Sequence, residues 1–220
     1  MKEIIIQNIP TIFSLIGVII GAILAHASNW ILKTRETKLL VTKTLIDKRI
    51  EAYEKIIAIA KVLRITVSTY EKDYDSNLIT YPRCLEDNES FELLFKTAST
   101  AINDSSHWLD TQTTRELGLV QDYLATLSIY VRNINQSNNA DFVLKDLGII
   151  IKQDFIDLSS SLEKVIFKSY PQNLINLKTN YSFDWHKYQK DETHRRLSKL
   201  KLIENEKLIL SKINTARDEN

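Results

Sequence analysis

The sequence feature that most constrains this chain is an uncharged stretch between Glu3 and Lys33. Residues Ile4 to Leu32 are mostly Ile, Leu, Val, Ala, Gly and Phe. A helix of about 20 such residues crosses the hydrocarbon core of a bilayer, and a longer one crosses it with some tilt. The stretch therefore predicts a transmembrane helix at residues 9–32, preceded by a short extracytoplasmic tail at residues 1–8.

A cleaved signal peptide is the alternative for this stretch, because Ala25-His26-Ala27 before Ser28 resembles a small-x-small cleavage site. Two features oppose cleavage: the residues before the run carry no clear net positive charge, and the run exceeds the roughly 7–15 apolar residues of a signal peptide. Apolar residues also resume at Trp30-Ile31-Leu32, and basic residues follow. The sequence favours a span that is retained.

Basic residues are concentrated just after the predicted span. Residues 33–64 contain nine Lys or Arg against four Asp or Glu, whereas the rest of the chain up to residue 182 is net acidic. Short flanks rich in Lys and Arg stay on the cytoplasmic side of a membrane. With Trp30, Lys33 and Arg35 as anchors at the membrane interface, we expect a single-pass protein of the cell membrane. Its N-terminus is expected outside and its C-terminal domain in the cytoplasm.

Small residues form a stripe along the predicted span. Their spacings of three and four residues place them on one face of a helix, and Gly17-x-x-x-Gly21 is a motif at which two helix backbones approach closely. The stripe predicts a homo-oligomer that forms through the transmembrane helix. The alternative is that glycine is simply common in spans. The stripe consists of Ser14, Gly17, Gly21, Ala25 and Ser28.

The rest of the chain predicts helices almost throughout. Four glycines and three prolines are too few for many hairpins, so we expect an all-α protein whose transmembrane helix continues into an antiparallel helical bundle. The first helix should run to about Tyr70 and be followed by a polar loop. The expected divisions are a cytosolic bundle at 33–170, a connector at 171–181 and an additional polar C-terminal helix at 182–220.

Two patterns predict how the third helix of the bundle begins and packs. Thr113-x-x-Glu116 has the form of a capping box, in which the two side chains bond to the first backbone N–H groups of a helix. Ser90 is expected to cap the N-terminus of the second helix, which precedes this one in the sequence. An apolar a/d repeat then continues over three heptads and predicts the buried face: Leu117, Val120, Leu124, Leu127, Val131 and Ile134.

The sequence contains no recognisable catalytic constellation. It has no Gly-rich phosphate loop and no H-E-x-x-H metal motif, and one cysteine, Cys84, cannot build a Cys-rich zinc site. Cys84 with His107 could be imagined as a nucleophile and a base, but a lone loop cysteine is more often inert. We therefore expect no enzyme activity, no catalytic residue, no metal and no cofactor.

A basic stretch near the C-terminus is a candidate surface for anionic ligands. With aromatic residues beside it, such a stretch could bind nucleic acid or an anionic membrane surface. The favoured alternative is the solvated face of an ordinary charged helix, because acidic residues continue the pattern. The candidate residues are Lys187, Lys190, Arg195, Arg196 and Lys199.

Three short segments after the span resemble a group of uncharacterised bacterial single-pass membrane proteins with a cytosolic helical domain. These segments are Lys48–Lys55, His107–Asp110 and Gln121–Leu124. Some proteins of this outline occur in phage-defence settings, so the resemblance implies a bacterial defence or stress role. The likeness carries no functional residue. Arg132-Asn133 also resembles the start of the HEPN ribonuclease motif, but residues 137–139 contain no histidine.

The leading hypothesis is a membrane-anchored helical interaction or effector protein that self-associates through its transmembrane helix. Its expected partners are the lipid bilayer, further copies of the chain and an unidentified protein. The alternative is a membrane-tethered protein that binds nucleic acid or a nucleotide through its basic C-terminal helix.

Overall fold

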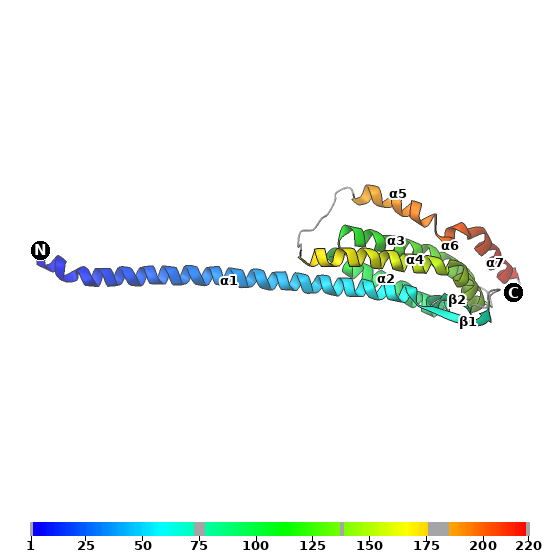
Figure 1. Ribbon diagram of the computed structural model, residues 1–220, viewed down its shortest axis with the longest axis horizontal. Helices are drawn as coiled ribbons and strands as arrows, with labels where there is room; N and C mark the ends of the chain where they lie inside the picture. Colours follow the sequence, from blue (N-terminus) through cyan, green and yellow to red (C-terminus); the bar gives the residue numbers. More distant parts are fainter. Residues whose placement is uncertain (1, 73–77, 137–138, 176–184, 219–220) are drawn as a thin grey trace. The chain divides into compact units, whose positions relative to one another are not determined.

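The computed structural model describes residues 2–72, 78–136, 139–175 and 185–218. Most of these residues are helical, as the sequence predicts (Figure 1). The chain divides into two compact units, Met1–Asp47 and Lys48–Asn220. The second unit contains the apolar core and the elements after the first helix.

The first unit is a single helical segment. Helix α1, Lys2–Arg64, is continuous from residue to residue and begins at Lys2, so most of the predicted tail 1–8 is helical. The apolar residues Ile4-Ile5-Ile6 belong to the same uncharged run as the span, and the helix continues through Pro10, although an interior proline removes one hydrogen bond and crowds the preceding turn. This helix is long and apolar enough to cross a membrane, and none of its most apolar window is buried within the protein.

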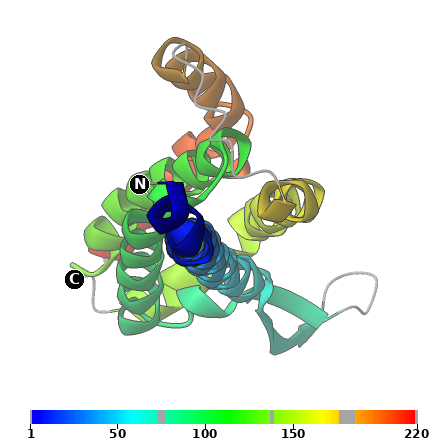
Figure 2. The same cartoon turned by 90° about the vertical axis from the view of Figure 1, so that its left-hand side faces the viewer.

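Helix α1 ends earlier than the sequence predicts, and a β-hairpin follows it. Strand β1, Thr66–Lys72, pairs antiparallel with β2, Leu78–Pro82. The predicted continuation to Tyr70 is wrong because the residues after Arg64 are rich in β-branched side chains, which favour strands. The two strands lie at the margin of the second unit (Figure 2).

Aspartates cap the next two α-helices, in place of the residues that the sequence analysis selected. The Asp87 carboxylate accepts a hydrogen bond from the Ser90 N–H at 2.7 Å, and the Asp110 carboxylate accepts from the N–H groups of Gln112 and Thr113. The predicted capping box is therefore wrong: the helix begins one turn earlier, at the aspartate. The elements in this part are η1 Arg83–Leu85, α2 Asn88–Ser105, η2 Ser106–Trp108 and α3 Thr111–Ile134.

The helices of the C-terminal half differ from their expected bounds. Helix α4, Ala140–Ile175, continues past the start of the predicted connector; the rest of that connector, 176–181, lies outside the described residues, as do residues 182–184 of the predicted C-terminal helix. The single polar helix predicted at 182–220 is three helices, separated around Ser198 and at Asn205. They are α5 Trp185–Leu197, α6 Lys201–Glu204 and α7 Glu206–Asp218.

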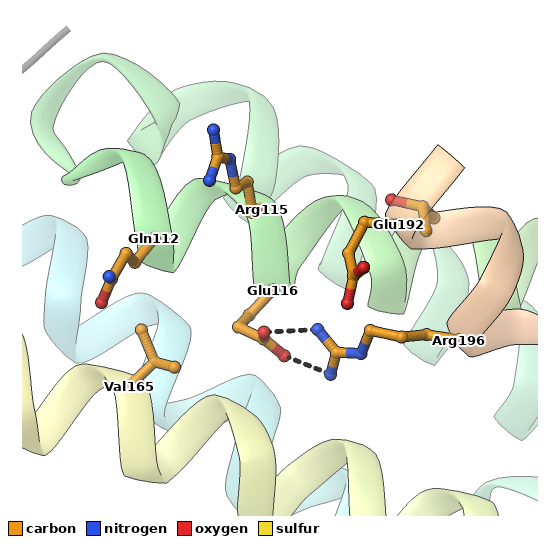
Figure 3. A pocket seen from close by; sticks show the side chains of 7 residues that line it. Gln112, Arg115, Glu116, Val165, Glu192 and Arg196 are labelled. Atoms are coloured by element: carbon orange, nitrogen blue, oxygen red, sulfur yellow. Dashed lines mark hydrogen bonds and ion pairs between the residues drawn. The ribbon is translucent and has the colours of Figure 1, made fainter. Parts of the chain in front are cut away.

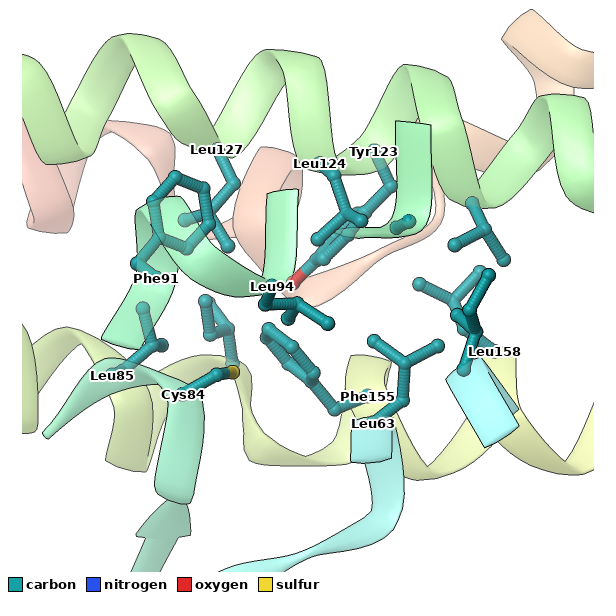
Figure 4. Packing of buried hydrophobic residues seen from close by; sticks show 14 of the residues in the cluster. Leu63, Cys84, Leu85, Phe91, Leu94, Tyr123, Leu124, Leu127, Phe155 and Leu158 are labelled. Carbon is teal, nitrogen blue, oxygen red and sulfur yellow. The ribbon is translucent and has the colours of Figure 1, made fainter. Parts of the chain in front are cut away.

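One apolar core joins the elements of the second unit. It includes the end of α1, η1 and α2 to α4, together with Leu202, Ile209 and Ile213 from α6 and α7. Helices α3 and α4 run side by side (Figure 1), and all six a/d residues predicted on α3 are buried. Figure 4 shows Phe155 of α4 beside Cys84 and Leu63 at the centre of this core.

Candidate functional site

The small-residue stripe of the predicted span lies on an uncovered face of α1. All five members, from Ser14 to Ser28, are exposed. A Cβ atom added to Gly17 or Gly21 would meet no other atom within 4 Å. The described part of the chain therefore leaves these glycines accessible for contact with another helix.

The predicted interface anchors are exposed on the same helix. The Trp30 side chain is 69% exposed, and Lys33 and Arg35 are also exposed. The Thr34 hydroxyl donates a hydrogen bond to the backbone carbonyl of Trp30 at 2.8 Å. This bond satisfies a polar hydroxyl within the helix, so Thr34 is compatible with the edge of a membrane.

The structure gives no support to a reactive cysteine. Cys84 lies in η1 with only 6% of its surface exposed, and burial raises the pKa of its thiol to about 12. A nucleophilic thiol needs a lowered pKa and access to substrate. His107, in η2, is exposed. Among the described residues, no cluster of His, Cys, Asp or Glu could hold a metal ion.

The basic C-terminal stretch lies in and just after α5, and its two arginines have acidic partners. The Arg195 guanidinium bonds to Glu192 on the same helix at 2.7 Å. Arg196 instead reaches Glu116 of α3 with two hydrogen bonds, at 2.5 and 2.8 Å. Lys199 is exposed. The side chains of Lys187 and Lys190 are not among those that the structure describes. Arg196 is thus brought into a contact between helices.

The Glu116–Arg196 pair connects α5 to the helices beneath it. Burial of the Glu116 carboxyl opposes its charge, but the hydrogen bonds from Arg196 and Ser161 outweigh burial, so its pKa is lowered. The Ser161 hydroxyl of α4 donates to Glu116 at 2.8 Å. A paired, hydrogen-bonded carboxylate of this kind stabilises the folded state only while it is charged.

Acid is therefore expected to remove the contribution of this pair. A carboxyl whose folded pKa is below its unfolded value of 4.5 stabilises the fold above that pH and loses its effect as the pH falls through the folded pKa. We expect Glu116→Gln to lower Tm by about 2–4 °C at pH 7, and we expect this deficit to shrink as the pH falls below 4.5. Thermal unfolding across this range measures the difference. Glu192→Gln, which alters an exposed pair, is the control; a constant Glu116→Gln deficit would contradict the assignment.

A second contact holds the C-terminal helices through Asp154 of α4. This carboxylate is 2% exposed and accepts hydrogen bonds from the backbone N–H groups of Lys201 and Leu202 at 2.7 and 2.9 Å. It also accepts one from the Tyr123 hydroxyl at 3.2 Å. Burial raises the pKa of Asp154, although these three donors act in the opposite direction. One side chain therefore joins α3, α4 and α6.

The position of Asp154 in the apolar repeat of α4 indicates burial, although a charged residue is ordinarily expected at the surface. The residue falls on the inward stripe of α4, four residues before Leu158 and three after Ile151, both of which are buried. A carboxylate at a core-facing position is rarely left without partners. The sequence could therefore have predicted a buried hydrogen-bonding role, but not which backbone groups it contacts.

A cavity of about 480 Å³ lies where α5 meets α3 and α4 (Figure 3). The Glu116–Arg196 pair forms part of its wall, and Arg115 extends away from that pair. The Nε atom of Arg115 is buried and has no hydrogen-bond partner in the part of the chain that the structure describes. Sequence analysis missed Arg115, because it stands alone among polar residues. The lining residues are Gln112, Arg115, Glu116, Val165, Glu192, Thr193 and Arg196.

Comparison of this chain with protein-family models, curated proteins and solved structures finds no match.

Proposed function

We propose that this chain is a membrane-anchored interaction or effector protein that self-associates through its transmembrane helix. The observation that carries the proposal is the exposed stripe on α1, where a Cβ atom added to Gly17 or Gly21 would meet no neighbouring atom of the described residues within 4 Å. Within a bilayer, helices associate through close packing rather than through the hydrophobic effect, and small residues permit that packing. The large apolar side chains around the stripe, such as Phe13 and Leu24, are suited to contact with lipid.

The second unit is proposed to be a cytosolic antiparallel helical bundle. The basic flank after Leu32 supports this orientation, with the N-terminus outside the cell membrane. Helix α1 has no break between Leu32 and Leu45, which supports a link between the cytosolic helices and association in the bilayer. Such a protein would signal to or assemble with a protein partner, and the resemblance noted above favours a bacterial defence or stress setting.

Replacing both glycines with isoleucine tests self-association. We expect Gly17→Ile/Gly21→Ile to convert the oligomer to a monomer, with association at least about tenfold weaker, because the branched side chains hold the backbones apart. The fold should be unchanged, since both positions are exposed and a Cβ added at either would meet no neighbouring atom of the described residues within 4 Å. Size-exclusion chromatography with light scattering in detergent measures the state.

The matched control is Ala22→Ile/Ala27→Ile. It introduces the same side chains into the same helix, but by helical spacing outside the stripe. We expect this variant to remain oligomeric. A wild-type monomer, or a glycine variant with the wild-type mass, would refute association through the stripe.

A further inference from the structure

The cavity beside α5 contains a cationic side chain whose charge has no partner among the described residues. Arg195 is paired with Glu192, and Arg196 is paired with Glu116. Arg115 forms no ion pair with the acidic side chains of the described residues, and its buried Nε atom has no hydrogen-bond acceptor among them. The two carboxylates in the cavity wall are therefore already engaged, whereas the third guanidinium is not.

An unpaired donor of this kind is costly. A buried donor that loses water without gaining an acceptor costs about 1–3 kcal/mol, and more when it belongs to a charged group. Such groups are rare in native proteins, and a missing ion or ligand is one physical reason for their presence. The cavity at this position offers the space for an acceptor to approach Arg115.

We propose that this cavity binds a small phosphate monoester, with Arg115 as the residue that holds the phosphate. A guanidinium presents two parallel N–H donors that match two phosphate oxygens. The Gln112 amide and the Thr193 hydroxyl line the same cavity and supply donors for the remaining oxygen and for the body of the ligand. The volume of about 480 Å³ exceeds the need of an inorganic ion and falls within the range of small-molecule sites.

The position of the cavity gives binding a structural consequence. Gln112 and Arg115 belong to α3, whereas Thr193 belongs to α5, so a ligand that contacts both helices favours the docked position of α5. A ligand that binds only this arrangement stabilises it by mass action. The inference is independent of self-association through α1, because every lining residue lies in the second unit.

The test uses the full chain in nanodiscs of phosphatidylcholine, with adenosine 5′-monophosphate as the probe and adenosine as its matched partner without phosphate. We expect calorimetry to show binding of the monophosphate with a Kd below about 1 mM, together with a rise in Tm, and no binding of adenosine. Arg115→Gln should weaken binding at least about tenfold. Arg132→Gln, at an exposed position on the same helix, should leave it unchanged.

Two further measurements complete the test. Arg115→Lys keeps the charge but lacks the paired donors, so intermediate binding by a variant with the wild-type circular dichroism spectrum supports the role of the guanidinium. Nanodiscs containing phosphatidic acid, whose headgroup is a phosphate monoester, distinguish the source of the phosphate: competition with the soluble probe assigns the site to a lipid headgroup, and its absence assigns the site to a free metabolite. No binding of the monophosphate, or equal binding by Arg115→Gln, would overturn the proposal.

Discussion

Asp154→Ala is expected to lower the free energy of unfolding of the second unit by about 3 kcal/mol. The change removes one acceptor from three donors: the Lys201 and Leu202 N–H groups and the Tyr123 hydroxyl. Each buried donor left without an acceptor costs about 1–3 kcal/mol, and the Leu202 and Tyr123 bonds are both buried. Urea unfolding of the full chain in detergent, followed by circular dichroism, measures the loss.

The effect should appear first at the C-terminal helices. Hydrogen exchange at the Lys201 and Leu202 amides is expected to accelerate in Asp154→Ala before the rest of the core opens, because these two amides lose the carboxylate that accepts their hydrogen bonds. Asp154→Asn should be nearly as damaging, since its amide nitrogen presents a donor where a carboxylate oxygen accepts one. Tyr123→Phe removes only one of the three bonds and should cost about 1 kcal/mol.

Asp157→Ala is the control for this prediction. Asp157 lies one turn along α4 from Asp154, is exposed, and accepts a hydrogen bond from the Gln153 amide on the surface. Substitutions of this kind usually change stability by less than about 0.5 kcal/mol. Equal effects of the two alanine substitutions would show that Asp154 does not hold the C-terminal helices.

Periodicity was sufficient to predict the helices and much of the core. On α3, the residues from Leu117 to Ile134 at a/d spacing are all buried. A regular apolar repeat places its residues on one face of a helix, and that face packs against the core. The same reasoning was less accurate on α7. There Leu208 and Leu210 are exposed, whereas Ile209 and Ile213 are buried; a mostly polar helix offers too few apolar residues to predict which of them face the core.

The features that the sequence did not reveal depend on contacts between distant residues. The hairpin is stabilised by pairing of residues such as Thr66 with Pro82, and local propensity alone did not separate it from a helix end and a loop. Arg196 was selected as part of an anionic-ligand surface, yet its partner Glu116 lies 80 residues away. Arg115 became notable only when the structure placed a cavity beside it. Sequence spacing describes a helix face but not what covers it.

Phe155→Ala is expected to lower the free energy of unfolding by about 3–5 kcal/mol, the range for removing a buried phenylalanine. Phe155 is 1% exposed, and its ring meets that of Tyr123 edge-on, with centroids 5.7 Å apart. The substitution removes this contact and leaves a cavity beside Cys84 and Leu63 at the centre of the core (Figure 4). Phe155→Leu retains most of the volume and should cost less than about 1.5 kcal/mol.

The same helix supplies a control of identical chemistry. Phe167 is 65% exposed on α4, so Phe167→Ala should change stability by no more than about 0.5 kcal/mol. Urea unfolding monitored by circular dichroism applies to all three variants, because the apolar part of α1 is expected to remain helical in detergent and provides a constant background. A loss in Phe167→Ala as large as that in Phe155→Ala would mean that α4 presents its other face to the core. Asp154, next to Phe155, would then not be buried either. The Asp154 and Phe155 substitutions therefore test the same orientation of α4 independently.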